Sequence, residues 1–471
     1  MSRVALIGAG SIVFTKQFLN DMFNTPCMKG STYVLMGPTM WKLNKMKEYA
    51  DQIIEKNNID AHIECTTDRR EALKEADFVI LTFQIGGVDA YQYDIDIPMK
   101  YGIDQCIGDS MGPGGVFRVL RSAPVLLDCW KDMKELCPDA YVLNYVNPMG
   151  AVCTTLARAT GMKFVGLCHG VQTTLDLISR YTGFPKDEID FVNAGINHMD
   201  WFLTLTHNGK DIYPILKENM EKPEYYKNEK VRGEVMRQCG YFMTESTGHL
   251  SEYLPWFRSS KRALERYCDE PMFGGEHGSY LKFNKMIQEK FKNTDVLSIE
   301  SGELEPRSKE YCSYIIEAII TGKPFKFSGN VSNANGYITN LPRNAVVEVP
   351  VYADKQGFHP VVIGDIPLHL AAMNQSNLTT QSLAAQAAID GDAEMAFWAI
   401  AMDPLSSTQV TLNECRKMVA EMFNAEKKWL PQFSETLKEL PDINVPEGTV
   451  GVSVPEDPAL AINSRFAKLA E

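Results

Sequence analysis

The start of the chain carries the pattern that most restricts its fold, a short apolar run followed at once by a glycine-rich turn. Residues 4–7 read Val-Ala-Leu-Ile, and the next four read Gly-Ala-Gly-Ser. Residues 12–22 then show the apolar spacing of an amphipathic helix. This order predicts a dinucleotide site at Gly8, Gly10 and Ser11, because such a turn lets a pyrophosphate approach backbone N–H groups at a helix N-terminus.

Further apolar runs that fit buried strands alternate with helical stretches such as residues 42–57. They lie at residues 33–36, 62–66, 76–81, 140–145 and 163–167. Strands joined by helices form parallel sheets through right-handed crossovers. We therefore predict an α/β fold whose first domain, residues 1–195, is a Rossmann-type, doubly wound parallel sheet.

The rest of the chain predicts an α+β domain at residues 196–450 and an irregular tail at 451–471. Its clearest elements are a strand at 345–349 and helices at 378–400 and 412–429.

The sequence leaves both NAD and NADP possible, because the second predicted strand ends at Gly37 without the acidic residue that usually holds the ribose diol of NAD. NAD is expected, and NADP stays open because Lys42 and Lys45 could contact a ribose phosphate. Gln84 and Gly86 follow the fourth predicted strand, where small residues let the chain pass close to a cofactor. A flexible turn is the alternative there.

Charge and hydropathy exclude several classes of protein. The net charge of −13 argues against nucleic acid or an anionic membrane as a partner, and no apolar run is long enough to span a bilayer. We expect no export signal and therefore a cytoplasmic location. The eleven cysteines lack the spacing of a disulfide framework and are expected to be reduced thiols.

One cysteine and one histidine stand out as possible metal ligands. Cys168 directly follows the apolar run at 163–167, at the sheet edge where such folds bind ligands, and His198 lies in the motif Gly-Ile-Asn-His-Met-Asp. A thiolate with an imidazole favours a divalent transition ion. The polar neighbours His169 and Asn197 support this interpretation and are candidate substrate contacts, although a buried thiol and a core histidine are the alternative.

Other polar residues are candidates for the chemistry. Asn147 ends the fifth predicted strand and could bind cofactor or sugar, or cap the next helix. Asp109, in a glycine-dense loop, is a candidate general acid or a helix cap, and Arg118 follows it. His249 and Tyr253 lie in a polar, aromatic segment; Tyr253 could act as a base if a nearby metal ion lowered its pKa.

In combination these motifs resemble glycoside hydrolase family 4, the NAD- and manganese-dependent glycosidases. The resemblance is carried by Asp-Ser-Met-Gly-Pro-Gly-Gly, Asn-Tyr-Val-Asn-Pro, Cys-His-Gly-Val, Gly-Ile-Asn-His-Met, Thr-Glu-Ser and Glu-Tyr-Leu-Pro-Trp-Phe, in this order. It implies a C-terminal domain like that of lactate and malate dehydrogenases, and assembly as a homodimer or homotetramer.

The resemblance also implies a redox route to hydrolysis. A hydride leaves C3 of the sugar for NAD, a base removes the C2 proton, the glycosidic oxygen is eliminated, and water adds before the hydride returns. By analogy Cys168 and His198 hold Mn²⁺ or another divalent metal, Tyr253 is the base, and Asp109 is the acid.

The sugar is predicted from the residue after Cys-His. Cys168-His169-Gly170 resembles enzymes that accept an α-hexuronide (α-glucuronide or α-galacturonide), where Gly170 leaves room and an arginine such as Arg118 could pair with the C6 carboxylate. An α-galactosidase or α-glucosidase is the alternative. A second class of function is an NAD(P)-dependent sugar or hydroxy-acid dehydrogenase. In that case His277, in the motif Gly-Glu-His-Gly, would be the acid/base residue. A non-catalytic sugar or nucleotide sensor is a third.

Overall fold

The computed structural model describes residues 1–10, 12–293, 302–441 and 466, so Ser11 and almost all of the predicted tail lie outside it. Its strands are β1 Arg3–Ile7, β2 Ser31–Met36, β3 Ala61–Thr66, β4 Phe78–Leu81, β5 Tyr141–Asn144, β6 Lys163–Gly166, β7 Ile189–Ile196, β8 Met199–His207, β9 Lys210–Asp211, β10 Phe325–Ser332, β11 Val346–Asp354 and β12 Gly357–Pro360.

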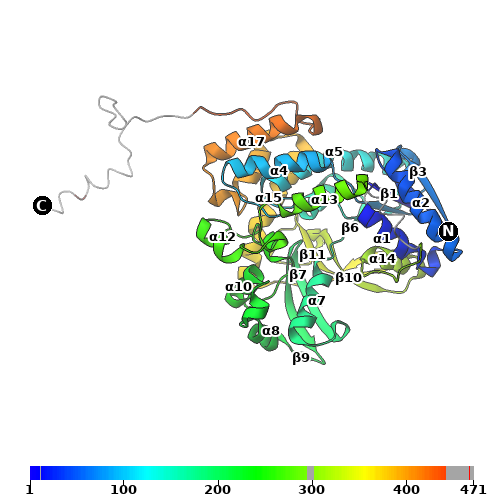
Figure 1. Cartoon of the computed structure of the whole chain (residues 1–471), viewed down its shortest axis with the longest axis horizontal. Coiled ribbons are helices and arrows are strands. Elements are labelled where there is room, and N and C mark those ends of the chain that lie inside the picture. The colour runs from blue at the N-terminus through cyan, green and yellow to red at the C-terminus, as the bar shows by residue number, and fades with distance from the viewer. Residues whose placement is uncertain (11, 294–301, 442–465, 467–471) are drawn as a thin grey trace. The chain divides into compact units, whose positions relative to one another are not determined.

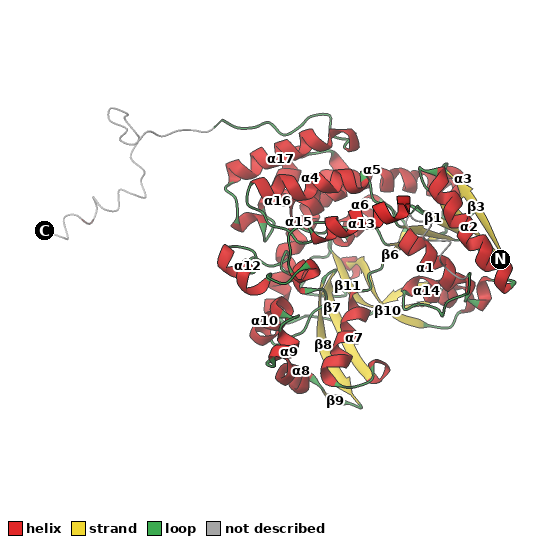
Figure 2. Cartoon of the chain, viewed as in Figure 1, coloured by secondary structure: helices red, strands yellow, loops and turns green. Residues whose placement is uncertain are grey.

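Helices flank these strands (Figures 1 and 2). They are α1 Ile12–Phe23, α2 Met40–Asn57, α3 Arg69–Leu73, α4 Gly87–Lys100, α5 Gly112–Leu136, α6 Met149–Ala159, α7 Gly170–Thr182, α8 Tyr213–Met220, α9 Pro223–Tyr226, α10 Lys230–Cys239, α11 Thr247–Leu250, α12 Lys261–Tyr267, α13 Ser279–Asn293, α14 Tyr311–Thr321, α15 Leu368–Asp390, α16 Ala393–Ala401 and α17 Leu412–Glu426. Over the described residues, no helix has the length and apolar content needed to cross a membrane.

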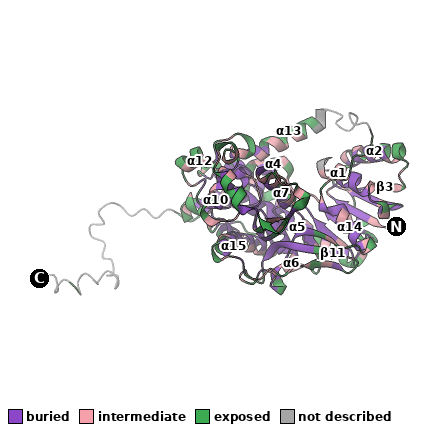
Figure 3. Ribbon diagram, turned by 90° about the horizontal axis from the view of Figure 1, so that it is seen from below, coloured by how far each residue is buried: buried purple, intermediate pink, exposed green. Residues whose placement is uncertain are grey.

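The predicted parallel sheet is confirmed. Strands β3-β2-β1-β4-β5-β6 pair in this order, and every pairing among them is parallel. Both faces are covered: Val4 and Leu6 of β1 pack in one apolar core, whereas Ala5 and Ile7 pack in another. A strand covered on both faces must be apolar at every position, which explains the continuous runs in the sequence and the buried strands in Figure 3.

The sheet does not stop at β6. It continues through antiparallel strands in the order β10-β11-β7-β8-β9, and β12 pairs with β11 beside this path, so that twelve strands of the described residues form one sheet. Gly166 pairs with Asn330, Asn330 with Glu348, and Glu348 with Gly195. This row brings the ends of β6 and β7 onto one line, although the pairing partners lie up to 164 positions apart in the sequence.

Residues 1–438 cluster as one compact unit, in which strands from both predicted domains share this sheet. The domain boundary at residue 195 therefore stays a prediction.

One predicted helix is wrong in its length. Residues 378–400 are two helices, the end of α15 and most of α16, and α15 starts earlier, at Leu368. Gly391 stops α15 with a left-handed backbone (φ +70°), and the Asp392 side chain accepts a hydrogen bond from the Met395 N–H to start α16. The helix predicted at 412–429 is α17 followed by a short 3₁₀ turn at Lys427–Trp429.

Candidate active site

A polar pocket of about 360 Å³ opens beside the carboxyl ends of β5 and β6. Six of the residues singled out in the sequence line it: Asp109, Asn147, Cys168, His169, His198 and His249. The structure adds Glu245, Arg232 and Tyr280 to the lining. A pocket of this size, with a few convergent polar groups, suits a small-molecule ligand.

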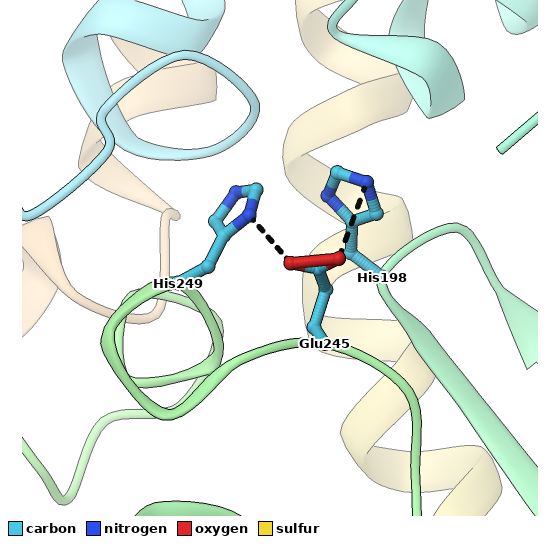
Figure 4. A group of neighbouring side chains, drawn as sticks. All are labelled: His198, Glu245 and His249. Atoms are coloured by element: carbon cyan, nitrogen blue, oxygen red, sulfur yellow. Dashed lines mark hydrogen bonds and ion pairs between the residues drawn. The ribbon is translucent and has the colours of Figure 1, made fainter. Parts of the chain in front are cut away.

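The centre of the pocket holds His198, Glu245 and His249, whose ligand atoms all lie within 4.8 Å of one another. The Glu245 carboxylate points between the two imidazole rings (Figure 4). Its Oε2 is 2.9 Å from Nδ1 of His249, and its Oε1 is 3.9 Å from Nε2 of His198. Imidazole and carboxylate are groups that hold divalent metal ions.

These three side chains have different protonation states. Burial lowers the pKa of His198 to about 4, so its ring is neutral. Burial alone would lower the pKa of His249 too, but its hydrogen bond and charge interaction with Glu245 raise it to about 9. Burial by itself would raise the pKa of Glu245, but the neighbouring imidazoles outweigh it and hold the pKa below its usual range. At neutral pH an anionic Glu245 therefore faces a neutral ring and a charged one.

Cys168 lies at the same pocket, just past β6. Burial and the negative charges of Glu348 and Glu245 raise the pKa of its thiol well above the usual value. Such a thiol is protonated at neutral pH unless a cation stabilises the thiolate. A neutral imidazole with a nearby thiol and carboxylate fits a transition metal ion, which would supply that stabilisation.

Tyr253 and Asp109 flank this group. The Tyr253 hydroxyl is 3.1 Å from Nδ1 of His198 and lies behind the rim rather than among the lining residues. Burial, with the charges of Asp109 and Glu245, raises the pKa of Tyr253 well above its usual value. Asp109 accepts a hydrogen bond from the Ser110 hydroxyl at 2.6 Å and lies 3.8 Å from Nε2 of His249.

Three residues that the sequence suggested as substrate contacts are not among those that line the pocket. Arg118 stands 3.4 Å from Asp109 and is not a lining residue. The Asn197 amide hydrogen-bonds the Cys168 thiol and faces Glu348 at 3.5 Å, so it lies behind the pocket. Gly170 begins α7, and a Cβ built there would lie 3.4 Å from the Cys168 sulfur.

The turn after β1, where the sequence predicts a dinucleotide, has a backbone that requires glycine. Gly8 has φ +101°, and a Cβ there would come within 2.7 Å of the Phe83 backbone, so only glycine fits. A Cβ on Gly10 would meet the Lys42 side chain at 3.6 Å. Gln84 reaches the Gly87 carbonyl at 3.3 Å, and Gly86, with φ +83°, caps α4. The two glycine turns therefore follow adjacent parallel strands, β1 and β4, at the sheet edge where such folds bind ligands, and the nucleotide site there stays a prediction.

His277, the histidine that would fit a dehydrogenase, lies outside this pocket. Its Nδ1 is 3.3 Å from the Gln105 N–H and 3.6 Å from Asp104.

Two buried carboxyls, Glu348 and Asp200, lie next to the site. Within the described residues, their side-chain hydrogen bonds come from asparagines and not from a basic side chain. Burial raises the pKa of Glu348 to about 7, and burial with Glu348 raises that of Asp200 well above its usual value. The unfolded Glu348 would ionise near pH 4.5.

We therefore expect Glu348 to lower the free energy of unfolding as pH rises from about 4.5 to about 7. Over that range the carboxyl is still protonated in the folded chain but ionised in the unfolded chain, so rising pH favours unfolding. The loss should be on the order of 3 kcal/mol and should level off above pH 7. Urea unfolding at pH 5 and pH 7.5 measures it. Glu348→Gln should flatten the difference, whereas Glu303→Gln, whose side chain is 73 % exposed, should not. Equal slopes for Glu348→Gln and the wild type would contradict this assignment.

Comparisons with known proteins agree with this arrangement. The profile described as Family 4 glycosyl hydrolase matches residues 3–183, and the profile of the Family 4 glycosyl hydrolase C-terminal domain matches residues 193–406. An α-galactosidase of Rhizobium meliloti (strain 1021) is 37% identical over 92% of this chain and 90% of its own length. An α-galacturonidase of Thermoanaerobacter italicus is 27% identical over 91% of this chain and 97% of its own length.

Among solved structures, a 6-phospho-α-glucosidase from gut microorganisms, in complex with NAD and Mn²⁺, superimposes with a TM-score of 0.74. It is 21% identical, over 92% of this chain and 99% of the other. The two profiles together cover most of the chain, and the relatives match nearly its whole length. This protein belongs to glycosyl hydrolase family 4 and is a glycoside hydrolase.

Proposed function

We propose that this glycosidase cleaves α-galactosides with the help of NAD and a divalent ion such as Mn²⁺. The observation that carries the proposal is that Cys168, His198 and Asp109 line one pocket, with the Tyr253 hydroxyl 3.1 Å from His198, in a fold whose first strand ends in a glycine turn. The 37% identical α-galactosidase, and the NAD and Mn²⁺ bound by the 6-phospho-α-glucosidase, support the choice of sugar, cofactor and metal.

The charge around the pocket favours a neutral sugar over the hexuronide expected from Gly170. The arginine that lines the described pocket is Arg232, and Glu229 already binds its guanidinium twice, at 2.6 Å each. Glu245 adds negative charge, because its pKa is held below the usual range. A C6 carboxylate would therefore find no free guanidinium among the described lining residues, whereas a C6 hydroxyl needs none.

An α-galacturonide is the second candidate, because it shares the ring configuration of galactose and differs only at C6. The specific observation in its favour is Gly170, which lacks the Cβ that would contact the Cys168 sulfur at 3.4 Å and Oε1 of Glu245 at 3.6 Å.

The residues suggest how the bond is broken. When bound, NAD supplies a hydride acceptor for C3, and the divalent ion supplies Lewis acidity at the sugar oxygens. His198 donates its Nδ1–H to the Tyr253 oxygen, which leaves Nε2 free for the ion. Tyr253 would first have to ionise, which a bound cation would favour by lowering the raised pKa of its hydroxyl, and the phenolate would then take the proton from C2. Asp109, in its acid form, would give a proton to the departing glycosidic oxygen. Arg118 and His249 hold Asp109 in place between them.

A panel of aryl α-glycosides tests this function. We expect the α-galactoside to have a kcat/KM at least about tenfold above the α-galacturonide, α-glucoside and α-glucuronide, a preference that one polar group can supply. Each substrate is measured with Mn²⁺ and either NAD or NADP, which also settles the role of Lys42.

The absorbance of reduced nicotinamide should not accumulate during turnover, because the hydride returns to the sugar. Accumulation in proportion to product would replace the proposal with a dehydrogenase. A preference for the galacturonide would select the second candidate, and a lack of activity on every glycoside would favour a sensor.

A further inference from the structure

Glu245 is the one central residue of the pocket to which the proposed mechanism gives no role. We propose that it is a third protein ligand of the divalent ion, so that Cys168, His198 and Glu245 form a site that holds the ion before any sugar arrives. This inference rests on the proposed metal dependence and goes beyond the cysteine–histidine pair.

The first argument is the distance between the facing atoms. Oε1 of Glu245 and Nε2 of His198 are 3.9 Å apart, too far for a hydrogen bond. Two metal–ligand bonds of about 2.1 Å each can span such a gap through one ion. The two atoms are therefore spaced as ligands of a shared cation.

The second argument is that the remaining polar atoms of both side chains are already engaged. Oε2 of Glu245 is held by His249 at 2.9 Å, and Nδ1 of His198 is held by Tyr253 at 3.1 Å. Metal ligands are commonly oriented in this way by hydrogen bonds to their second atom. What is left pointing into the gap is one carboxylate oxygen and one imidazole nitrogen (Figure 4).

The third argument is that the Cys168 thiol lies near the same carboxylate oxygen, beside the mutually close group of His198, Glu245 and His249. A Cβ built on Gly170 would lie 3.4 Å from the Cys168 sulfur and 3.6 Å from Oε1 of Glu245. The sulfur and the oxygen thus border one space that no side chain at position 170 fills. A carboxylate oxygen added to a thiolate and an imidazole would make the set of ligands more suitable for Mn²⁺, which prefers oxygen ligands.

The backbone supports the assignment. Glu245 has φ +83° and His198 has φ +64°, values that residues other than glycine rarely adopt. Holding a non-glycine residue there costs free energy, and such residues cluster at ligand sites. Both facing residues therefore carry backbone strain at the point where the ion would sit.

The test measures binding of Mn²⁺ alone to the full chain, without sugar or NAD, by the electron paramagnetic resonance signal of free Mn²⁺. We expect the wild type to bind one ion and Glu245→Gln to weaken the affinity at least tenfold, because an amide is a neutral, poorer ligand. The matched control is Glu310→Gln, a carboxyl 3.8 Å from His169 but outside the central cluster, which should stay within twofold of the wild type. The melting temperature of each variant checks that it is folded.

The outcomes separate this inference from the proposed function. Equal Mn²⁺ affinity for Glu245→Gln and wild type would overturn the role of Glu245, while a loss in Cys168→Ser would keep the metal site. A wild type that binds Mn²⁺ only when a sugar is added would also overturn the inference. If neither Cys168→Ser nor Glu245→Gln changes the affinity, the metal site itself is wrong. As a second readout, Co²⁺-loaded Glu245→Gln should keep the thiolate charge-transfer band but change its ligand-field bands.

Discussion

Tyr253→Phe is expected to lower kcat on an aryl α-galactoside by roughly two to four orders of magnitude, the usual contribution of a general base. The substitution removes one oxygen and leaves a buried ring, so the fold should survive. The loss should appear in kcat with little change in KM, because the hydroxyl acts on the C2 proton in the transition state and not in sugar binding.

A C2-deuterated substrate ties the loss to proton removal. The wild type should show slower turnover with deuterium, since Tyr253 takes the C2 proton. Tyr226→Phe, a tyrosine outside the pocket, is the matched control and should retain full activity. A Tyr253→Phe enzyme that keeps more than about a tenth of kcat would exclude this residue as the base, because general-base catalysis contributes about a hundredfold or more.

Cys168→Ser is the second change with a large expected effect. A serine hydroxyl is a poor substitute for a thiolate, and loss of the ion removes several kcal/mol of transition-state stabilisation, which corresponds to about a hundredfold or more in rate. We expect activity to become independent of added Mn²⁺ and to fall by at least that factor.

The control for this variant is Cys27→Ser, at a half-buried cysteine outside the pocket lining, which should behave as the wild type. The Co²⁺-loaded wild type should show a thiolate-to-metal band that disappears in Cys168→Ser. Retained Mn²⁺-dependent activity in Cys168→Ser would remove Cys168 from the site.

The parallel half of the fold was predictable because local patterns determine it. Residues 33–36 and 163–167, for example, are apolar runs that became strands within two residues of their predicted bounds. A strand buried on both faces needs apolar side chains at each position, and this need is visible without any distant contact. The glycine turn at Gly8 was predictable for the same reason, since its backbone excludes a side chain.

Other features depend on contacts between distant segments. The break between α15 and α16 was missed because apolar spacing continues through Gly391. The antiparallel extension of the sheet was not expected either, since the pairing of Gly166 with Asn330 joins residues 164 positions apart. Glu245 lies in the sequence motif Thr-Glu-Ser, but nothing local distinguishes it from an acidic residue at the surface. Its positive φ and its place between two histidines appear only in the folded chain.

The sequence by itself determined the parallel sheet and the family resemblance, and it singled out Cys168 and His198, because these depend on short motifs and on burial of single strands. Only the tertiary structure decided what surrounds that pair. The row from Gly166 to Gly195 brings two strand ends together, while the segment before α11 carries Glu245 to them and α11 itself carries His249. Charge and distance in a pocket depend on where the chain returns in space, and sequence spacing carries no information about that.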